Sequence, residues 1–419
     1  MNQNVLPGAA PDLVAFHALF DAVARFGATP AGGLHRLAAS AHEGHARDFV
    51  CDWLRQRGFS LRVDPAGNIF ACLALAGEDA PWVLTGSHLD SQPGGGRFDG
   101  ALGVVAACVA AHAIARAQGM PFHRNLGVAI WTNEEGARFA PSMLGSGVFA
   151  GQYDFGFARA REDADGVTLA QALALTGYDG QDRGPEHVAA YLELHIEQGP
   201  ELERSGVTIG VVRGNWGTNK YLFEMTGVAA HTGPTPMSQR RDALLAAARL
   251  VIACRALSDA TGGRLLTSVG RMDIHPNSSN VIAARVTVFV ELRCTDNDEL
   301  QRASRALEGE AGRIGIETGT EVAWHQVTDR PAGSFDGALC QLIADVASER
   351  GLKAMDLQTV AGHDAVSLRA RCPTAMIFVP SKDGVSHNEA EYTSARDLEA
   401  GVEVLCGVLA RLVALSPGS

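Results

Sequence analysis

Strand-like apolar runs alternate along this chain with amphipathic helical patterns, and this alternation restricts the possible fold more than any other feature. It is typical of an α/β sheet that is covered by helices on both faces. The expected helices cover residues 12–26, 42–57 and 101–117, and the expected strands cover residues 68–75, 82–85 and 126–132.

The pattern changes near Gly210 and returns to the first type at Phe335. Between these points, long helical patterns are separated by runs in which apolar and polar residues strictly alternate, as in "ARVTVFVELRC". The order strand–helix–strand–strand–helix–strand is that of a ferredoxin-like α+β unit. We therefore predict an α/β/α domain formed by residues 1–211 and 329–419, with an α+β domain inserted at 212–328.

Length and charge exclude several classes of protein. The chain has 419 residues, enough for two domains, and its net charge of −12 disfavours a nucleic acid or an anionic membrane as partner. No apolar run approaches the ~20 residues that span a bilayer, and the N-terminus lacks the pattern of a secretory signal. The eight cysteines are scattered without a C-x-x-C pair, as is typical of reduced, buried thiols. We therefore expect a cytoplasmic protein.

Histidines and carboxylates lie at or beyond the ends of four predicted strands. In an open α/β sheet, ligand sites form beyond the carboxyl ends of the strands, so we expect these side chains to lie close together. The polar residues at these ends are His88 with Asp90, Glu134 with Glu135, His195, and His387.

A glycine-rich loop, "GSHLDSQPGGGRFDG", carries His88 and a further acid, Asp99. If both residues bind metal, the chain between them must fold back tightly, and glycine permits the positive φ angles and close approaches that this requires. Three histidines, Asp99 and one glutamate are a sufficient ligand set for two divalent cations that share a carboxylate. Of the neighbours Glu134 and Glu135, one can bind metal while the other takes a proton from the attacking water.

Each of these residues also has a simpler interpretation. A histidine after a strand is usually a surface residue or a satisfied core residue, and adjacent glutamates usually form a solvated face. A glycine run can be an ordinary loop. The metal site is favoured because four such features occur in one chain, each associated with a predicted strand end.

Seven motifs, in order along residues 42–412, resemble those of the dinuclear-metal amidohydrolases that hydrolyse N-carbamoyl-L-amino acids. The motifs are "GSHLDSQPGGGRFDGALGV", "TNEEGARFAPSMLGSGVFAG", "HIEQGPELE", "AHTGPTPMSQRRDAL", "PNSSNVI", "AGHDAVSL" and "SHNEAEYT". The same group contains β-ureidopropionases and allantoate amidohydrolases, within the wider aminoacylase/carboxypeptidase (M20-like) superfamily. The motifs are specific for this family and less specific for the substrate.

This resemblance implies two divalent metal ions per subunit. The implied ligands are Asp99 as the bridge, His88 and His195 for one ion, and Glu135 and His387 for the other. Asp90 would orient the imidazole of the first histidine, and Glu134 would be the general base. The ligand types suit Zn, Mn, Co or Ni and do not decide between these metals.

The resemblance also implies substrate-binding residues, several of them in the inserted domain, which in this family acts as a lid and a dimer interface. Arg293 would clamp the substrate carboxylate, and His231 would stabilise the developing oxyanion. Gln198, Asn280 and the backbone at Gly362 match further substrate contacts. From the residues alone, Arg293 is typical of a surface ion pair and Asn280 of a turn, so these alternatives remain open.

The implied reaction is hydrolysis of the carbamoyl C–N bond of an N-carbamoyl-L-amino acid to the L-amino acid, CO2 and ammonia. The partners would then be a small-molecule substrate with a free carboxylate and a second copy of the chain. Three alternatives remain open: allantoate or N-carbamoyl-β-alanine as substrate of the same site, a metallopeptidase or deacylase, and a binding protein without catalysis. Glu134 disfavours the last, because a site that only binds metal needs no spare carboxylate.

Overall fold

The computed structural model describes residues 9–416, and the chain forms two compact units. The first, which we call the α/β unit, comprises the chain up to Arg213 and again from Phe335 onward. The second, which we call the inserted unit, is Gly214–Ser334. The predicted α/β class is confirmed. None of the helices between residues 9 and 416 combines the length and apolar character needed to cross a membrane.

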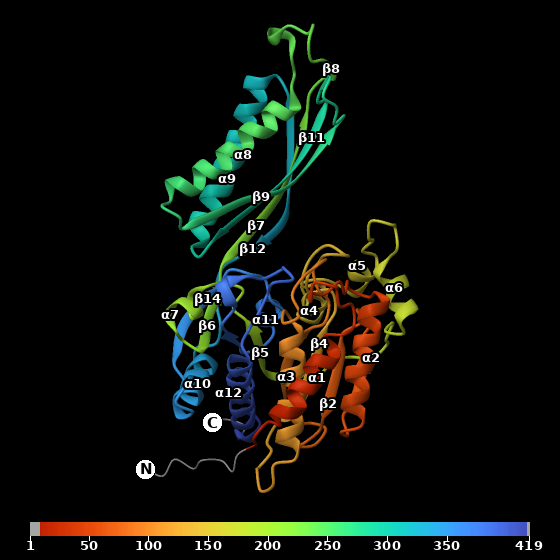
Figure 1. Cartoon of the computed structure of the whole chain (residues 1–419), viewed down its shortest axis with the longest axis vertical. Helices are drawn as coiled ribbons and strands as arrows, with labels where there is room; N and C mark the ends of the chain where they lie inside the picture. Colours follow the sequence, from red (N-terminus) through yellow and green to blue (C-terminus); the bar gives the residue numbers. More distant parts are fainter. Residues whose placement is uncertain (1–8, 417–419) are drawn as a thin grey trace. The chain divides into compact units, whose positions relative to one another are not determined.

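A mixed nine-stranded sheet has the order β1-β2-β4-β3-β5-β15-β6-β13, with β14 paired to β6. It lies in the α/β unit except for the end of β6 and the short β13, which fall within residues 214–334. Figure 1 labels five of these strands: β2, β4, β5, β6 and β14. The centre of the sheet is parallel, because β3 pairs in parallel with β4 and β5, and β5 pairs in parallel with β15. The strands are β1 (Ser60–Val63), β2 (Ile69–Leu73), β3 (Trp82–His88), β4 (Asn125–Trp131), β5 (Val188–Ile196), β6 (Ile209–Asn215), β13 (Gly333–Ser334), β14 (Ala354–Thr359) and β15 (Thr374–Val379).

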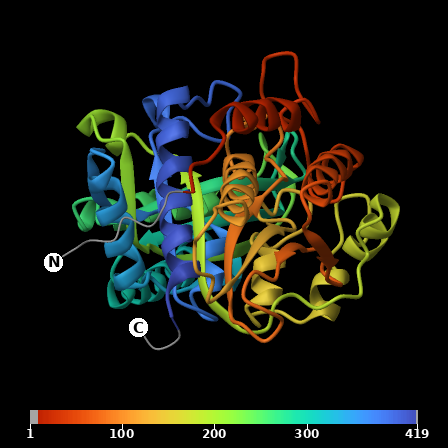
Figure 2. The same cartoon turned by 90° about the horizontal axis from the view of Figure 1, so that it is seen from below.

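Helices pack on this sheet, and one of them lies almost entirely in the core. Twelve of the fifteen residues of α3 (Ala101–Ala115) are buried. Its small side chains allow close approach to β5, because a Cβ on Gly103 would lie 2.5 Å from the carbonyl oxygen of Leu194. Figure 2 shows α3 beside α12. The other helices are α1 (Leu13–Val23), α2 (Ala41–Arg55), α4 (Leu144–Phe149), α5 (Phe155–Arg159), α6 (Leu169–Thr176), α7 (Glu201–Ser205), α10 (Gly337–Glu349), α11 (Asp364–Leu368), α12 (Ala395–Ala414) and the 3₁₀ turn η2 (Lys382–Gly384).

The inserted unit has an antiparallel four-stranded sheet in the order β12-β7-β11-β9, with α8 and α9 side by side on one face (Figure 1). The strict alternation in β11 has a direct cause. Every second side chain along the strand is buried in the core of this unit, and the side chains between them are more exposed. The elements are β7 (Gly217–Thr226), β8 (Ala230–His231), η1 (Met237–Gln239), α8 (Ala243–Ala260), β9 (Leu265–His275), β10 (Val281–Ile282), β11 (Arg285–Cys294), α9 (Asn297–Thr318) and β12 (Glu321–Arg330).

One boundary bears on the site. The strand predicted at 82–85 continues to His88, because Gly86, Ser87 and His88 remain paired with β4. All three are buried, although two of them are polar. The polar residues at the end of β3 therefore belong to the sheet itself and are held by its backbone hydrogen bonds.

Candidate metal centre

The carboxyl ends of four neighbouring strands carry the predicted ligands, as the parallel register requires. His88 is the last residue of β3, and it pairs with Trp131 at the end of β4, just before Glu134 and Glu135. His195 lies at the end of β5 and pairs with Phe378 of β15. The chain after β15 passes through η2 and returns to the same edge. His387 lies there as well, because its Nε2 is 3.4 Å from Asp99 and 3.4 Å from Glu135.

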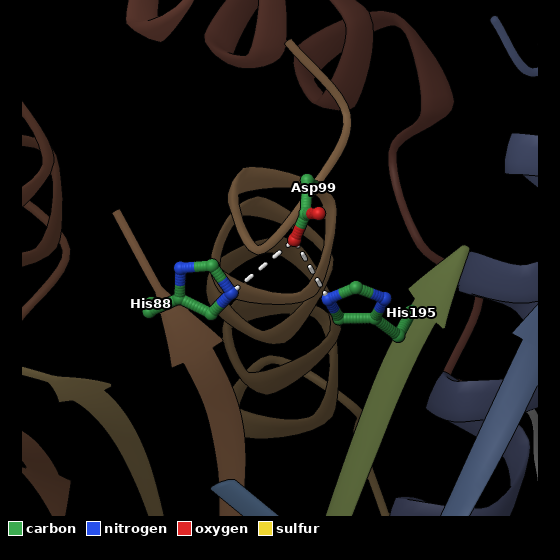
Figure 3. Close-up of side chains that lie close together, drawn as sticks. All are labelled: His88, Asp99 and His195. Carbon is green, nitrogen blue, oxygen red and sulfur yellow. Dashed lines mark ion pairs between the residues drawn. The ribbon is translucent and has the colours of Figure 1, made fainter. Parts of the chain in front are cut away.

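Asp99 directs its two carboxylate oxygens toward two different sets of side chains. Oδ1 lies 3.4 Å from Nε2 of His88 and 3.2 Å from Nε2 of His195 (Figure 3). Oδ2 lies 3.4 Å from Nε2 of His387, and that nitrogen lies 3.4 Å from Oε2 of Glu135. In each set, the ligand atoms lie within 4.8 Å of one another. One carboxylate is therefore shared by two clusters of possible metal ligands.

The spacing within both clusters fits a divalent metal ion. Two ligands bound at about 2.0–2.1 Å to one tetrahedral ion lie roughly 3.3–3.4 Å apart. The separations between histidine nitrogen and carboxylate oxygen match this value. A third possible cluster of Glu193, His195 and His363 shares one histidine with the first. Its Glu193 already accepts hydrogen bonds from Ser87, Tyr191 and the Ala365 N–H.

The glycines between His88 and Asp99, and Gly100 directly after them, differ in what they allow the backbone to do. Gly94 and Gly100 both have a φ of +66°, a conformation that disfavours a side chain. At Gly100 there is also no space, because a Cβ would lie 2.5 Å from Nδ1 and Nε2 of His88. Gly96 has ordinary φ, but a Cβ there would overlap the carboxylate of Glu391. Gly94 thus supplies a positive φ alone, Gly96 supplies close approach alone, and Gly100 combines the two.

Asp90 supports both the first histidine and the glutamates. Nδ1 of His88 lies 3.0 Å from the backbone oxygen of Asp90 and 3.7 Å from its carboxylate Oδ1. The two carboxylate oxygens accept the backbone N–H groups of Glu134 and Glu135, each at 3.2 Å. Asp90 therefore orients His88 mainly through its backbone, while its side chain fixes the loop that carries both glutamates.

Burial dominates the electrostatics of the two glutamates. It raises the pKa of Glu134 well above the usual 4.5, against the effect of His88 and together with nearby carboxylates. Burial and the Asp99 carboxylate raise the pKa of Glu135 to about 7. Asp99 differs: burial alone would raise its pKa, but hydrogen bonds from the three histidines hold that pKa well below the usual 3.8. Divalent cations would take over this compensating role.

Two of the predicted substrate contacts lie at these clusters. Nε2 of Gln198 donates a hydrogen bond to Oδ2 of Asp99 at 2.6 Å. Gly362 directly precedes His363, whose ring centroid lies 4.4 Å from that of His195. Strained backbone gathers in the same place, because Asn133, Gln198 and His387 have positive φ angles of 55°, 57° and 52°. Such conformations cost about 1 kcal/mol each or more in residues other than glycine.

The three predicted residues of the inserted unit do not all lie together. His231 in β8 pairs with Val281. The backbone N–H of Thr232, which follows His231, donates a hydrogen bond to the backbone oxygen of Asn280. Both therefore lie beyond the end of the sheet where β11 begins. Arg293 lies near the other end of β11, opposite Thr218, beside the carboxylate of Glu291.

Sequence reasoning missed Glu391 and Ser386, although the motif "SHNEAEYT" contains both. The carboxylate of Glu391 is 5% exposed and accepts the backbone N–H groups of Phe98 and Asp99. Ser386 donates to the other oxygen of this carboxylate. The signal in the sequence was an acid four residues after His387, a predicted ligand. The partner of this acid, Asp99, is almost three hundred residues away in the sequence.

Comparisons with known proteins agree on the family. Residues 84–411 match the model of peptidase family M20/M25/M40. A putative hydrolase of Mycolicibacterium smegmatis is 45% identical over 92% of this chain and 90% of its own length. An N-carbamoyl-L-amino-acid amidohydrolase of Rhizobium meliloti is 38% identical over 91% of this chain and 92% of its own length. The crystal structure of a hydantoinase/carbamoylase family amidase from Burkholderia vietnamiensis superposes with a TM-score of 0.92 at 39% identity, covering 98% of this chain and 100% of that one.

The chain therefore belongs to peptidase family M20/M25/M40, among relatives that include hydantoinase/carbamoylase amidases. The family resemblance seen in the motifs is confirmed. The chain is a hydrolase that acts on carbon–nitrogen bonds other than peptide bonds. Enzymes of this family generally use divalent metal ions, and the described residues include groups that could hold them.

Proposed function

We propose that this member of the M20/M25/M40 family hydrolyses the carbamoyl C–N bond of N-carbamoyl-L-amino acids and releases the L-amino acid, CO2 and ammonia. The observation that carries the proposal is the position of Asp99 between two clusters of possible ligands, with Glu134 beside one of them. The likeness to an N-carbamoyl-L-amino-acid amidohydrolase supports the choice of substrate.

Two divalent ions are the proposed cofactors. Asp99 would bridge them, with His88 and His195 completing one site and Glu135 and His387 the other. When bound, the ions would acidify a water molecule and polarise the carbonyl group of the substrate. Histidine and carboxylate ligands suit Zn, Mn, Co or Ni.

Glu134 is the proposed general base. Its Oε2 lies 3.7 Å from Nε2 of His88, so it borders one cluster but is absent from the sets of possible ligands found among the described residues. It would take a proton from the attacking water and pass that proton to the departing nitrogen. Cleavage of this bond releases ammonia and leaves a carbamate, which decays to CO2 and the free amino acid.

The remaining predicted residues would bind the substrate. Arg293 would hold the carboxylate with its planar guanidinium, and His231 would stabilise the oxyanion. Gln198, Asn280 and the backbone at Gly362 would complete the contacts. A neutral ureido group needs such positioning because it brings no charge of its own.

The positions of His231 and Arg293 support a homodimer. Along β11, Arg285 pairs with Thr226 and Arg293 pairs with Thr218, so eight residues separate the two ends. At the usual rise per residue this is about 26 Å, longer than an N-carbamoyl amino acid. One substrate therefore cannot contact His231 and Arg293 of the same copy. A second copy would supply one of them.

The function is tested by ammonia release from a panel of compounds, using protein stripped of metal and reloaded with Mn²⁺, Co²⁺, Ni²⁺ or Zn²⁺. The panel holds N-carbamoyl-L-amino acids, their D-forms, N-carbamoyl-β-alanine, allantoate and a dipeptide. Metal-dependent turnover of the L-compounds supports the proposal. Turnover of allantoate or N-carbamoyl-β-alanine alone would keep the chemistry and replace the substrate. If the protein binds metal but turns over none of these compounds, the proposed hydrolysis of N-carbamoyl-L-amino acids is excluded.

A further inference from the structure

We propose that Glu391 is a positioning residue that joins the two proposed metal sites into one unit. This inference rests on the proposed metal centre, but Glu391 itself belongs to neither cluster of possible ligands. Its side chain is buried, 5% exposed, and its partners lie on two separate segments of the α/β unit. One segment carries Asp99 and the other carries His387.

The first carboxylate oxygen of Glu391 holds the backbone at Asp99. Oε1 accepts the N–H of Phe98 at 3.0 Å and the N–H of Asp99 at 3.1 Å. These amides lie just before α3, whose first residues have no side-chain cap. Gly96 leaves space for the carboxylate, because a Cβ there would overlap it. The direction of the Asp99 side chain therefore depends on Glu391.

The second oxygen holds the segment that carries His387. Oε2 accepts a hydrogen bond of 2.9 Å from the hydroxyl of Ser386, the residue directly before His387. The same hydroxyl lies 3.3 Å from Oδ2 of Asp99, the oxygen directed toward His387. The buried carboxylate of Glu391 thus holds Asp99, which both clusters share. It also holds Ser386, the neighbour of His387, which belongs to only one cluster.

This arrangement matters because His387 is far more exposed than the other four proposed ligands. Its side chain is 50% exposed and its backbone is strained, with a φ of 52°. Residues behind metal ligands commonly change metal affinity 10–100-fold when they are removed, because an unsupported ligand samples many directions. We expect the loss of Glu391 to weaken binding of the ion at Glu135 and His387 most. Binding of the other ion should also weaken, because Asp99 is shared by both sites.

Three variants separate positioning from charge and from general damage. Glu391→Ala removes both sets of hydrogen bonds. Glu391→Gln keeps them, because its amide oxygen can accept from the Phe98 and Asp99 N–H groups while its NH2 donates to Ser386. Glu389→Ala is the matched control: this acid is two residues earlier, and its carboxylate contacts Thr29 instead.

The test is isothermal titration calorimetry of the stripped full-length protein with Mn²⁺ alone, with thermal unfolding of each metal-free variant as the check on folding. Wild type should bind two ions. Glu391→Ala should bind at least one ion about 10–100-fold more weakly, whereas Glu391→Gln and Glu389→Ala should stay within roughly threefold of wild type. Two ions bound by Glu391→Ala with wild-type affinity would overturn the inference.

Two further outcomes are also decisive. If Glu391→Ala does not fold, Ser386→Ala replaces it, because it removes the hydrogen bond to Oε2 and leaves those to Oε1 in place. Gln198→Ala is its control, because the Ser386 hydroxyl also contacts Gln198 and Asp99. Unchanged binding in Ser386→Ala would then overturn the inference, and weaker binding would support it. If wild type itself binds fewer than two ions, the proposed metal centre fails, and that result differs from a failure confined to Glu391.

Discussion

The side chains of Glu134 and His88 lie next to each other in the folded chain. Oε2 of the glutamate is 3.7 Å from Nε2 of the histidine, the same nitrogen that faces Asp99. A carboxylate in this position borders a proposed metal site without being required as a ligand. Glu135, the next residue, faces His387 on the other side of Asp99. The loop that Asp90 fixes thus directs two adjacent glutamates to different sides of Asp99.

Glu134→Gln should abolish turnover and leave metal binding intact. A glutamine cannot accept the proton of the attacking water, and loss of a general base typically costs 10²–10⁴-fold in kcat. Because Glu134 is not among the proposed ligands, two ions per chain should still bind. Ammonia release and metal content of the same sample check both parts.

Glu135→Gln is the matched comparison for this prediction. The charge change is identical, but the side chain is a proposed ligand beside His387, so metal content should fall toward one ion per chain. Equal metal content in both variants would contradict the division of tasks between the two residues.

Gly100→Ala and Gly94→Ala should differ, although both positions have a φ of +66°. At Gly94 a Cβ meets nothing within 4 Å, so alanine should lower the free energy of unfolding only by the conformational cost of about 1–2 kcal/mol. At Gly100 the added carbon also meets the His88 ring, so the loss should be larger and metal affinity should fall. Denaturant unfolding and Mn²⁺ titration of both variants check this. Equal behaviour would contradict the steric account of the loop.

The metal-free protein should lose stability as pH rises from about 5 to 9. Burial and Asp99 raise the pKa of Glu135 to about 7 from 4.5, and the hydrogen bond to Asp99 raises the pKa of His387 to about 9 from 6.5. In this window the folded state binds more protons than the unfolded state, so the free energy of unfolding falls as pH rises. The stabilisation from His387 is complete below pH 6.5 and is lost as pH rises through about 9.

Bound metal should reverse much of this trend, because metal ligands must be deprotonated and metal binding therefore strengthens as pH rises. Urea unfolding of stripped and reloaded protein near pH 5, 7 and 9 measures both effects. The gap between the two forms should widen with pH. A stripped protein that becomes more stable over this range would contradict the prediction.

His231→Ala and Arg293→Ala should complement each other when the two inactive proteins are unfolded and refolded together. If each active site takes one of these residues from each copy, a mixed dimer has one site with both residues intact. About half of the dimers are then mixed, and roughly a quarter of wild-type activity returns. No recovery, with mixed dimers confirmed by mass spectrometry, would contradict the two-copy arrangement.

Much of the fold could be predicted because its periodicity is local. The alternation in β11 and the alanine-rich pattern of α3 mark their elements, and their boundaries lie within a few residues of those expected. Where the prediction fell short, tertiary pairing was the cause: β3 continues through Ser87 and His88 because β4 still pairs with them. Polar side chains there obscure a buried strand.

The candidate site was predictable only in part. His88 and His195 could be placed because they lie at strand ends, where the sheet determines their direction. Glu391 could not, because its partners at Phe98 and Asp99 are backbone amides, which leave no mark in the sequence. The separation of His231 from Arg293 also depends on the strand register of the inserted unit, which the pattern of residues does not reveal.

The most direct measurement is a titration of the stripped protein with Mn²⁺ in which bound metal and ammonia release from an N-carbamoyl-L-amino acid are recorded on the same samples. We expect activity to remain low until the second ion binds and to reach its maximum at two ions per chain, with Glu134→Gln binding the same two ions and remaining inactive. Full activity at one ion or none would contradict a centre in which Asp99 serves two metals.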